Sequence, residues 1–236
     1  MQTNLPVVAP GANEPAPAAP VYATADLAFL LDLAVQGDIR PCDLVAALSV
    51  RFSRMLEGYV DDPNRFREVL DETDSVISGS FVLRFIEGAT DWAEGDLDVY
   101  VDSVSVDEVE QFLEGEGYVT AEEAQERRIY DHGGGSIREV KKLSKPGTPC
   151  SIDLIVSRNK LSVFPIADFW GTQVMNFLTG SSICIAYPHT LNHIAFVVPR
   201  RSTDWKVPIL VGKYQQRGYE FREFDREREL SEEAHW

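Results

Sequence analysis

The stretch from residue 76 to residue 102 constrains the fold of this chain more than any other feature. It begins with Val76-Ile77, passes through Ser78-Gly79-Ser80, and ends with the run Gly95-Asp96-Leu97-Asp98-Val99-Tyr100-Val101-Asp102. Within residues 81–87, apolar residues recur at helical spacing. From residue 96 on, acidic residues alternate with apolar ones, which is typical of a strand with one buried face. The stretch therefore predicts a buried strand at 75–78, a glycine turn, a helix at 81–87 and a second strand at 97–101.

Helix and strand patterns alternate along the rest of the chain. Helix signals open at Thr24 or Asp26, at Pro41 and at Asp62-Pro63, because capping residues or a proline there precede apolar residues at helical spacing. Further strand patterns lie at 137–143 and 151–156, and the glycine-rich stretch at 131–136 predicts a hairpin turn. We expect an α+β fold with α/β character: a mixed β-sheet flanked by helices, with an N-terminal helical layer.

Composition divides the chain into four regions. Residues 1–20, rich in Pro and Ala, are expected to be a disordered tail. Residues 21–73 are expected to form helices that pack on a core at 74–200, and 201–236 a charged C-terminal helical segment. The tail has five Pro and no Lys or Arg, unlike a signal peptide or presequence, and no run approaches the ~20 apolar residues of a membrane span. We expect a cytoplasmic protein with no membrane partner, and a nuclear location stays open.

The charge of the chain argues against a nucleic-acid partner. The formal net charge is −16, and the stretch from Glu94 to Glu126 holds twelve acidic residues and no Lys or Arg. Affinity for nucleic acids rests largely on Lys and Arg contacts to phosphates, which an acidic field opposes. A polynucleotide would have to bind through the cations Arg200, Arg201, Lys206 and Lys213. Most of the acidic residues of this stretch are expected to form a solvated face, and part of them to serve metal binding.

Three aspartates are candidates for a metal site. Asp96 and Asp98 are two residues apart on a predicted strand, so both side chains point to the same face of the sheet. Paired carboxylates suit Mg²⁺ or Mn²⁺, hard cations that take oxygen ligands. Asp102 has the same parity but lies roughly 13 Å beyond Asp98 at strand rise, too far to share the ion. Asp153 stands in the apolar run 151–156 and completes a triad if its strand lies beside that of Asp96 and Asp98.

The turn at Gly79-Ser80 is a candidate phosphate site. It joins a strand to a helix, so the first backbone N–H groups of the helix can face an anion. Glycine allows a phosphate to come close to the backbone, and the Ser80 hydroxyl adds a donor. Arg84 follows one helical turn later and either reaches the same anion or is an ordinary surface residue.

With these residues in place, the chain resembles the nucleotidyltransferase-fold (polymerase-β-like) superfamily. The resemblance covers roughly residues 65–200 and rests on Ile77, Gly79-Ser80, the pair Asp96 and Asp98, and Asp153 as third acid. The stretch 77–102, and Val174-Met175-Asn176-Phe177 after the third acid, also look like uncharacterised fungal members of the fold. The resemblance implies two-metal transfer of a nucleoside monophosphate from an NTP to a hydroxyl, with Asp153 as ligand of a second metal and base for the hydroxyl.

Two functions follow as expectations. In the first, the protein is a metal-dependent nucleotidyltransferase whose acceptor is a hydroxyl of a small molecule or a protein. In the second, it is a catalytically inactive module of the same fold that senses a nucleotide or binds a protein partner.

His189 and His193 are four residues apart, a spacing that can bind zinc on a helix, but they lack the glutamate of the His-Glu-x-x-His motif. We do not expect a metal there.

Overall fold

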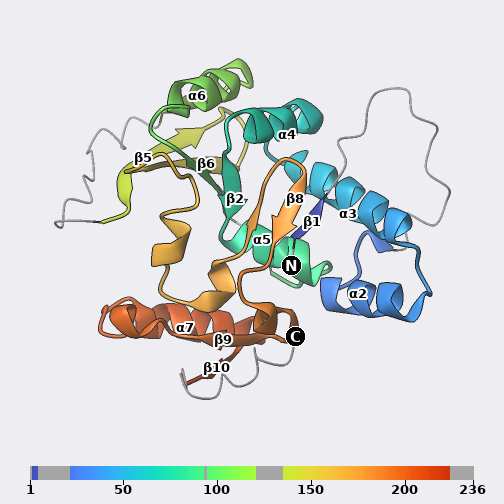
Figure 1. Cartoon of the computed structure of the whole chain (residues 1–236). Coiled ribbons are helices and arrows are strands. Elements are labelled where there is room, and N and C mark those ends of the chain that lie inside the picture. Colours follow the sequence, from blue (N-terminus) through green and yellow to red (C-terminus); the bar gives the residue numbers. More distant parts are fainter. Residues whose placement is uncertain (1, 5–21, 93–94, 121–134, 224–236) are drawn as a thin grey trace.

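The fold is described from a computed structural model, which covers residues 2–4, 22–92, 95–120 and 135–223. Its helices and strands are drawn in Figure 1. The α-helices of the described residues are α2 (Leu27–Gln36), α3 (Pro41–Leu56), α4 (Pro63–Glu72), α5 (Ser80–Glu87), α6 (Val106–Gly115) and α7 (Val207–Gln216). The strands are β1 (Gln2–Asn4), β2 (Val76–Ser78), β3 (Asp96–Val101), β4 (Val119–Thr120), β5 (Ile137–Ser144), β6 (Ser151–Ser157), β7 (Phe177–Leu178), β8 (Ser182–Cys184), β9 (Ile194–Phe196) and β10 (Glu220–Arg222).

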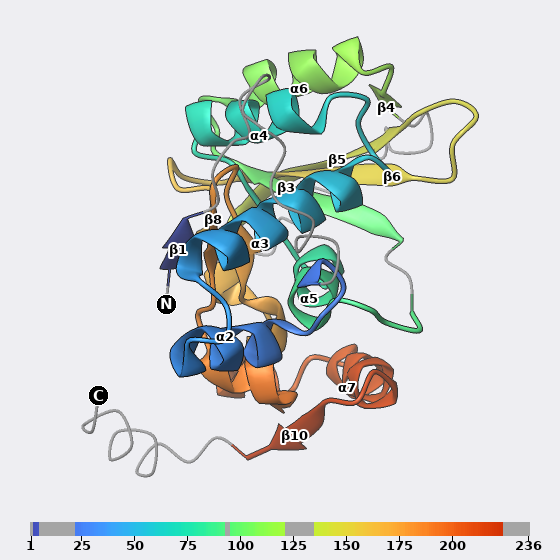
Figure 2. The same cartoon turned by 90° about the vertical axis from the view of Figure 1, so that its right-hand side faces the viewer.

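The main sheet is mixed, as the sequence predicts. Its strands lie in the order β1-β8-β7-β2-β3-β6-β5-β4, and β9 and β10 form a separate pair. Strands β3 and β6 run parallel, whereas their outer neighbours β2 and β5 are antiparallel to them. In Figure 2, helices α4 and α6 lie on one side of β3, β5 and β6, and α7 lies on the other. The fold is therefore α+β, with helices on the sheet and helices preceding it in the chain.

The N-terminal helices begin where the sequence predicts. The carboxylates of Asp26 and Asp62 accept hydrogen bonds from backbone N–H groups in the first turns of α2 and α4. Helix α2 ends at Gly37, whose φ of 83° lies in the left-handed region that favours glycine. The apolar faces of α2, α3 and α4 join α5, α6 and the inner strands in one large core, so the helical layer and the sheet share a hydrophobic interior.

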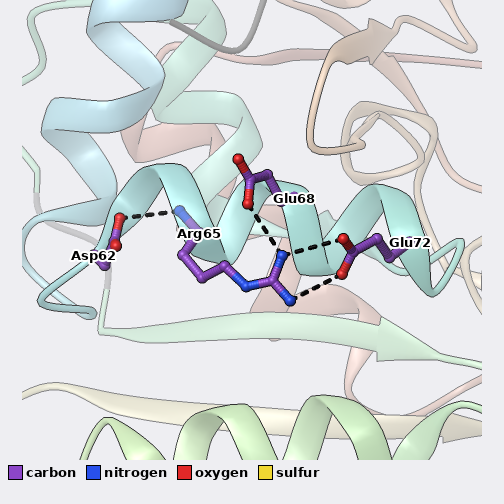
Figure 3. Close-up of polar contacts among 4 residues, drawn as sticks. All are labelled: Asp62, Arg65, Glu68 and Glu72. Carbon is purple, nitrogen blue, oxygen red and sulfur yellow. Dashed lines mark hydrogen bonds and ion pairs between the residues drawn. The ribbon is translucent and has the colours of Figure 1, made fainter. Parts of the chain in front are cut away.

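The exposed face of α4 shows where part of the chain's acidity goes. Arg65 lies between Glu68 and Glu72 and donates to both carboxylates at 3.0–3.1 Å, while Asp62 caps the helix start (Figure 3). All three charged partners are largely exposed, so water screens these ion pairs and they contribute little to stability. This side of α4 is therefore a charged face in contact with water.

One buried arginine connects the N-terminal helices to α5. Arg51 of α3 is 3% exposed, and its guanidinium donates to the Phe85 carbonyl at 2.7 Å and to the Ala23 carbonyl at 2.8 Å. It also donates to the carbonyls of Tyr22 and Ala25, just before α2. Because Phe85 belongs to the last turns of α5, this cation fixes the helix that follows the Gly79-Ser80 turn.

The C-terminal region differs from the expected long helix. Helix α7 ends at Gln216, and Gly218, with φ of 90°, turns the chain into strand β10, which runs parallel to β9. Tyr214 and Tyr219 are both buried on either side of this turn, and their rings meet edge to face. Burial of these two aromatic side chains favours a turn over a continued helix at 217–222. The remainder, 224–236, lies outside the described residues.

Two other predictions fall largely outside the described residues. The hairpin turn predicted at 131–136 is described only from Gly135 on, and β5, which follows it, pairs with β4 and β6. Within the predicted tail, only 2–4 are described, and they pair with β8.

Among the described helices, none has the length and apolar character that crossing a bilayer requires.

The Arg51 contacts generate a stability prediction. Replacing Arg51 with methionine keeps the long side chain but leaves several buried carbonyls without a donor, each at a cost of about 1–3 kcal/mol. We expect Arg51→Met to lower the free energy of unfolding by about 3 kcal/mol or more, measured by urea denaturation. Arg54→Met, on the exposed side of the same helix, is the matched control. An Arg51→Met variant as stable as this control would contradict the role of Arg51.

Candidate metal and phosphate site

Asp96, Asp98 and Asp153 converge at one end of the parallel pair β3 and β6. Each can offer one carboxylate oxygen, and these oxygens all lie within 4.8 Å of one another. The register of the two strands places Asp98 directly opposite Asp153, and Asp96 opposite Ser151. The sequence left open whether the strand of Asp153 lies beside that of Asp96 and Asp98, and the structure shows that it does. Three oxygen ligands at this separation fit a divalent metal ion such as Mg²⁺.

The apolar residues of the two strands hold the carboxylates in this position. Leu97 and Val99 on β3, and Ile152 and Leu154 on β6, are all 0% exposed and belong to the large core. Because successive side chains of a strand point to opposite faces, burying these four forces the three aspartates to the other face. A shift of either strand by one residue would turn the acids into the large core, so the register is strongly fixed.

The triad is electrostatically strained when no cation is bound. Burial raises the pKa of Asp98 to about 7, and the charges of Asp96 and Asp153 add to this effect. The pKa of Asp153 is also raised by burial and by Asp96, although Lys142 opposes the rise. A cation between the three groups would remove this repulsion and favour the ionised carboxylates.

Two lysines flank the triad, and the sequence analysis assigned neither of them to the metal site. Lys142 on β5 is directly opposite Asp153, and its Nζ donates to both carboxylate oxygens, at 3.1 and 3.3 Å. Lys213 on α7 is close enough for the charges of Asp96 and Asp98 to oppose the lowering of its pKa that burial and Arg217 cause. The strand pattern at 137–143 places Lys142 on a strand, but its position opposite Asp153 follows from the β5–β6 pairing, which the sequence alone does not give.

Gly79 lies directly against the triad. It is buried, with φ of 74° and ψ of −147°, and it immediately precedes the first residue of α5. A Cβ added at Gly79 would collide with Oδ2 of Asp98. Two features therefore favour glycine here, the positive φ of the backbone and the close approach of the Asp98 carboxylate.

The other residues of the predicted phosphate site lie on α5. Ser80 is the first residue of this helix and is partly exposed, and Arg84 lies one turn later, also partly exposed. The residue before the turn has a structural role that the sequence analysis missed. Ser78 is fully buried, and its hydroxyl lies 2.7 Å from the Asn176 carbonyl and 3.2 Å from that of Val174, to which it can donate. This contact ties the turn to the segment that precedes β7.

Asp102 is separate from the site, as predicted. One carboxylate oxygen accepts hydrogen bonds from the backbone N–H groups of Val104 and Ser105, and the other accepts from the Ser105 hydroxyl. These hydrogen bonds stabilise the turn that leads into α6. Among the described residues, the one group of three or more potential metal ligands is the aspartate triad. His189 packs on Phe196 and His193 on Tyr219.

Comparisons with protein-family models, with curated proteins and with solved structures find no match for this chain. The functional argument therefore rests on the site itself.

The contact between Gly79 and Asp98 generates a prediction. Gly79→Ala introduces a Cβ that strains the backbone by about 1–3 kcal/mol and pushes the Asp98 carboxylate away. We expect a lower melting temperature and at least a roughly ten-fold weaker Mn²⁺ affinity, measured by thermal denaturation with and without the metal. Gly95→Ala is the matched control, because a Cβ there meets nothing within 4 Å although Asp96 is adjacent. Equal metal affinity in both variants would contradict the account.

The raised pKa of Asp98 generates a second prediction, for the metal-free protein. A carboxyl with a raised pKa in the folded state binds its proton more tightly there than in the unfolded chain. The stability that the protonated Asp98 carboxyl contributes to the folded state is therefore fully present below about pH 4. It is lost as the pH rises through about 7. We expect Asp98→Asn to raise the melting temperature in EDTA at pH 8, with a smaller gain at pH 5.5.

Asp102→Ala is the control for this experiment and has the opposite sign. Asp102 accepts backbone hydrogen bonds, so its replacement is expected to lower the melting temperature. If Asp98→Asn also lowered stability in EDTA at pH 8, the electrostatic strain assigned to the triad would be wrong.

Proposed function

We propose that this protein is a metal-dependent nucleotidyltransferase that moves a nucleoside monophosphate from an NTP to a hydroxyl of a small molecule or a protein. Under this proposal, Asp96, Asp98 and Asp153 hold Mg²⁺ or Mn²⁺. The backbone at Gly79 and Ser80 holds the triphosphate, and Arg84 supplies a cation one turn along α5. The α+β fold and the order of these residues in the chain agree with the resemblance to the polymerase-β-like superfamily.

The observation that carries the proposal is the contact between the Gly79-Ser80 turn and the aspartate triad. Gly79 comes so close to Asp98 that no side chain fits between them, and Gly79 directly precedes the first turn of α5. A phosphate bound at the start of α5 would therefore lie next to a cation bound by Asp98. A helix N-terminus beside the carboxylates suits a ligand that carries both a metal ion and a phosphate.

The residues of the site have defined roles in the proposed transfer. The acceptor oxygen forms a bond to the α-phosphorus, and the bond from that phosphorus to the bridging oxygen breaks, so that pyrophosphate leaves with the electron pair. Asp153 accepts the proton of the acceptor hydroxyl, a role that suits a carboxyl whose pKa is raised by burial. The divalent ion, when bound, neutralises the charge that develops on the transferred phosphoryl group.

Charge supports a small molecule or a protein as acceptor. Arg200 and Arg201 both pair with Asp168, at 2.8 and 3.7 Å, so these two cations are already partly neutralised within the protein. The ammonium of Lys206 lies 5.4 Å from the centre of the Trp205 ring. With a net charge of −16, the chain offers little of the cationic surface that a nucleic acid binds.

A thermal-shift experiment tests the proposed function. We expect one NTP to raise the melting temperature in the presence of Mg²⁺, and the Asp96→Asn, Asp98→Asn double variant to lose this shift. A ligand at about 100 times its Kd stabilises by about 2.7 kcal/mol, which is readily measured. Pyrophosphate release with candidate acceptors then tests turnover.

Two results distinguish the alternatives. Metal-dependent NTP binding without pyrophosphate release from any acceptor would favour the catalytically inactive module that senses nucleotide. The absence of any shift with all four NTPs would contradict the nucleotide site and leave protein binding as the remaining function of the fold.

A further inference from the structure

The ion pair between Lys142 and Asp153 occupies one edge of the carboxylate triad. The Lys142 side chain is 60% exposed, whereas that of Asp153 is 14% exposed, so the ammonium reaches a partly buried carboxylate from the solvent side. The pKa of Lys142 is raised by its hydrogen bond to Asp153 and by the charges of Asp153, Asp96 and Asp98. Lys142 is therefore a counter-ion of the whole triad as well as of its nearest carboxylate.

A divalent cation and this ammonium compete for the same charge. Asp153 has two carboxylate oxygens, and Lys142 Nζ lies within 3.3 Å of both. A metal ion held by one of these oxygens would lie a few ångström from the ammonium, where two positive charges repel each other. The lysine has a long, flexible and exposed side chain, so it can turn away without any change in the backbone.

We propose that Lys142 is a built-in counter-ion that weakens metal binding until a polyphosphate arrives, and that it then binds the polyphosphate. This inference rests on the proposed function, since it requires a metal at the triad and a triphosphate beside it. Strand β5 lies beyond β3 and β6 from the Gly79-Ser80 turn, so the displaced ammonium would meet the part of a metal-bound triphosphate that this turn does not hold. Metal and triphosphate would then bind cooperatively, because each removes a cost that the other faces alone.

The neighbouring residue on β5 provides a matched control. Lys141 points to the opposite face of the strand and pairs with Glu110 of α6 at 2.6 Å. Replacing either lysine with methionine removes one positive charge from β5 at almost the same position in the chain. A general effect of net charge would be the same in both variants, whereas an effect through the triad appears only at position 142.

The test measures binding directly and needs neither the donor nor the acceptor to be known. Free Mn²⁺ is titrated by electron paramagnetic resonance against wild type, Lys142→Met, Lys142→Arg and Lys141→Met. We expect Lys142→Met to bind Mn²⁺ about three- to ten-fold more tightly than wild type, as removal of one nearby positive charge implies. At saturating Mn²⁺, the same variant is expected to bind inorganic tripolyphosphate at least about three-fold more weakly. Lys142→Arg and Lys141→Met should stay within about two-fold of wild type in both titrations.

The outcomes separate this inference from the proposed function. If wild type and Lys142→Met bind Mn²⁺ equally well, and the Asp96→Asn, Asp98→Asn variant does not, the metal site stands and the role of Lys142 is wrong. If neither wild type nor Lys142→Met binds Mn²⁺, both the proposed function and this inference are overturned. Binding by Lys142→Met alone would be the strongest support, since the lysine would then block the site completely. Melting curves in EDTA verify that each variant is folded.

Discussion

Three carboxylates whose oxygens lie within 4.8 Å of one another are the feature on which this structure depends. Like charges at this distance repel, and the fold must hold them together by other means. The parallel register of β3 and β6 does so, because Leu97, Val99, Ile152 and Leu154 are completely buried on the opposite face. The hydrophobic core thus fixes the geometry of a polar site, and a bound cation would relieve the remaining repulsion.

The sequence predicts this architecture to the extent that local patterns determine it. Alternation on β3 places Asp96 and Asp98 on one face, and the acid within an apolar run identifies Asp153. What the sequence does not contain is strand pairing. The contact of Lys142 with Asp153 depends on the β5–β6 register. The end of α7 depends on the burial of Tyr214 and Tyr219. Both the register and this burial are set by distant parts of the chain.

The site is balanced between its own charge and that of its ligands. Under the proposed function, the carboxylates attract the metal ion and the positive charges of the two flanking lysines oppose this attraction. Lys142 meets the triad from β5, and Lys213 approaches it from α7. Such an arrangement favours ligands that bring both signs of charge, as a metal–triphosphate complex does.

The most direct test of this account is a crystal structure with Mn²⁺, in which anomalous scattering locates the metal without reference to any reaction. The account predicts an anomalous peak between the carboxylates of Asp96, Asp98 and Asp153, with the Lys142 ammonium turned away from Asp153. Anomalous peaks only elsewhere on the acidic surface, or a triad still closed by Lys142 at saturating Mn²⁺, would contradict it.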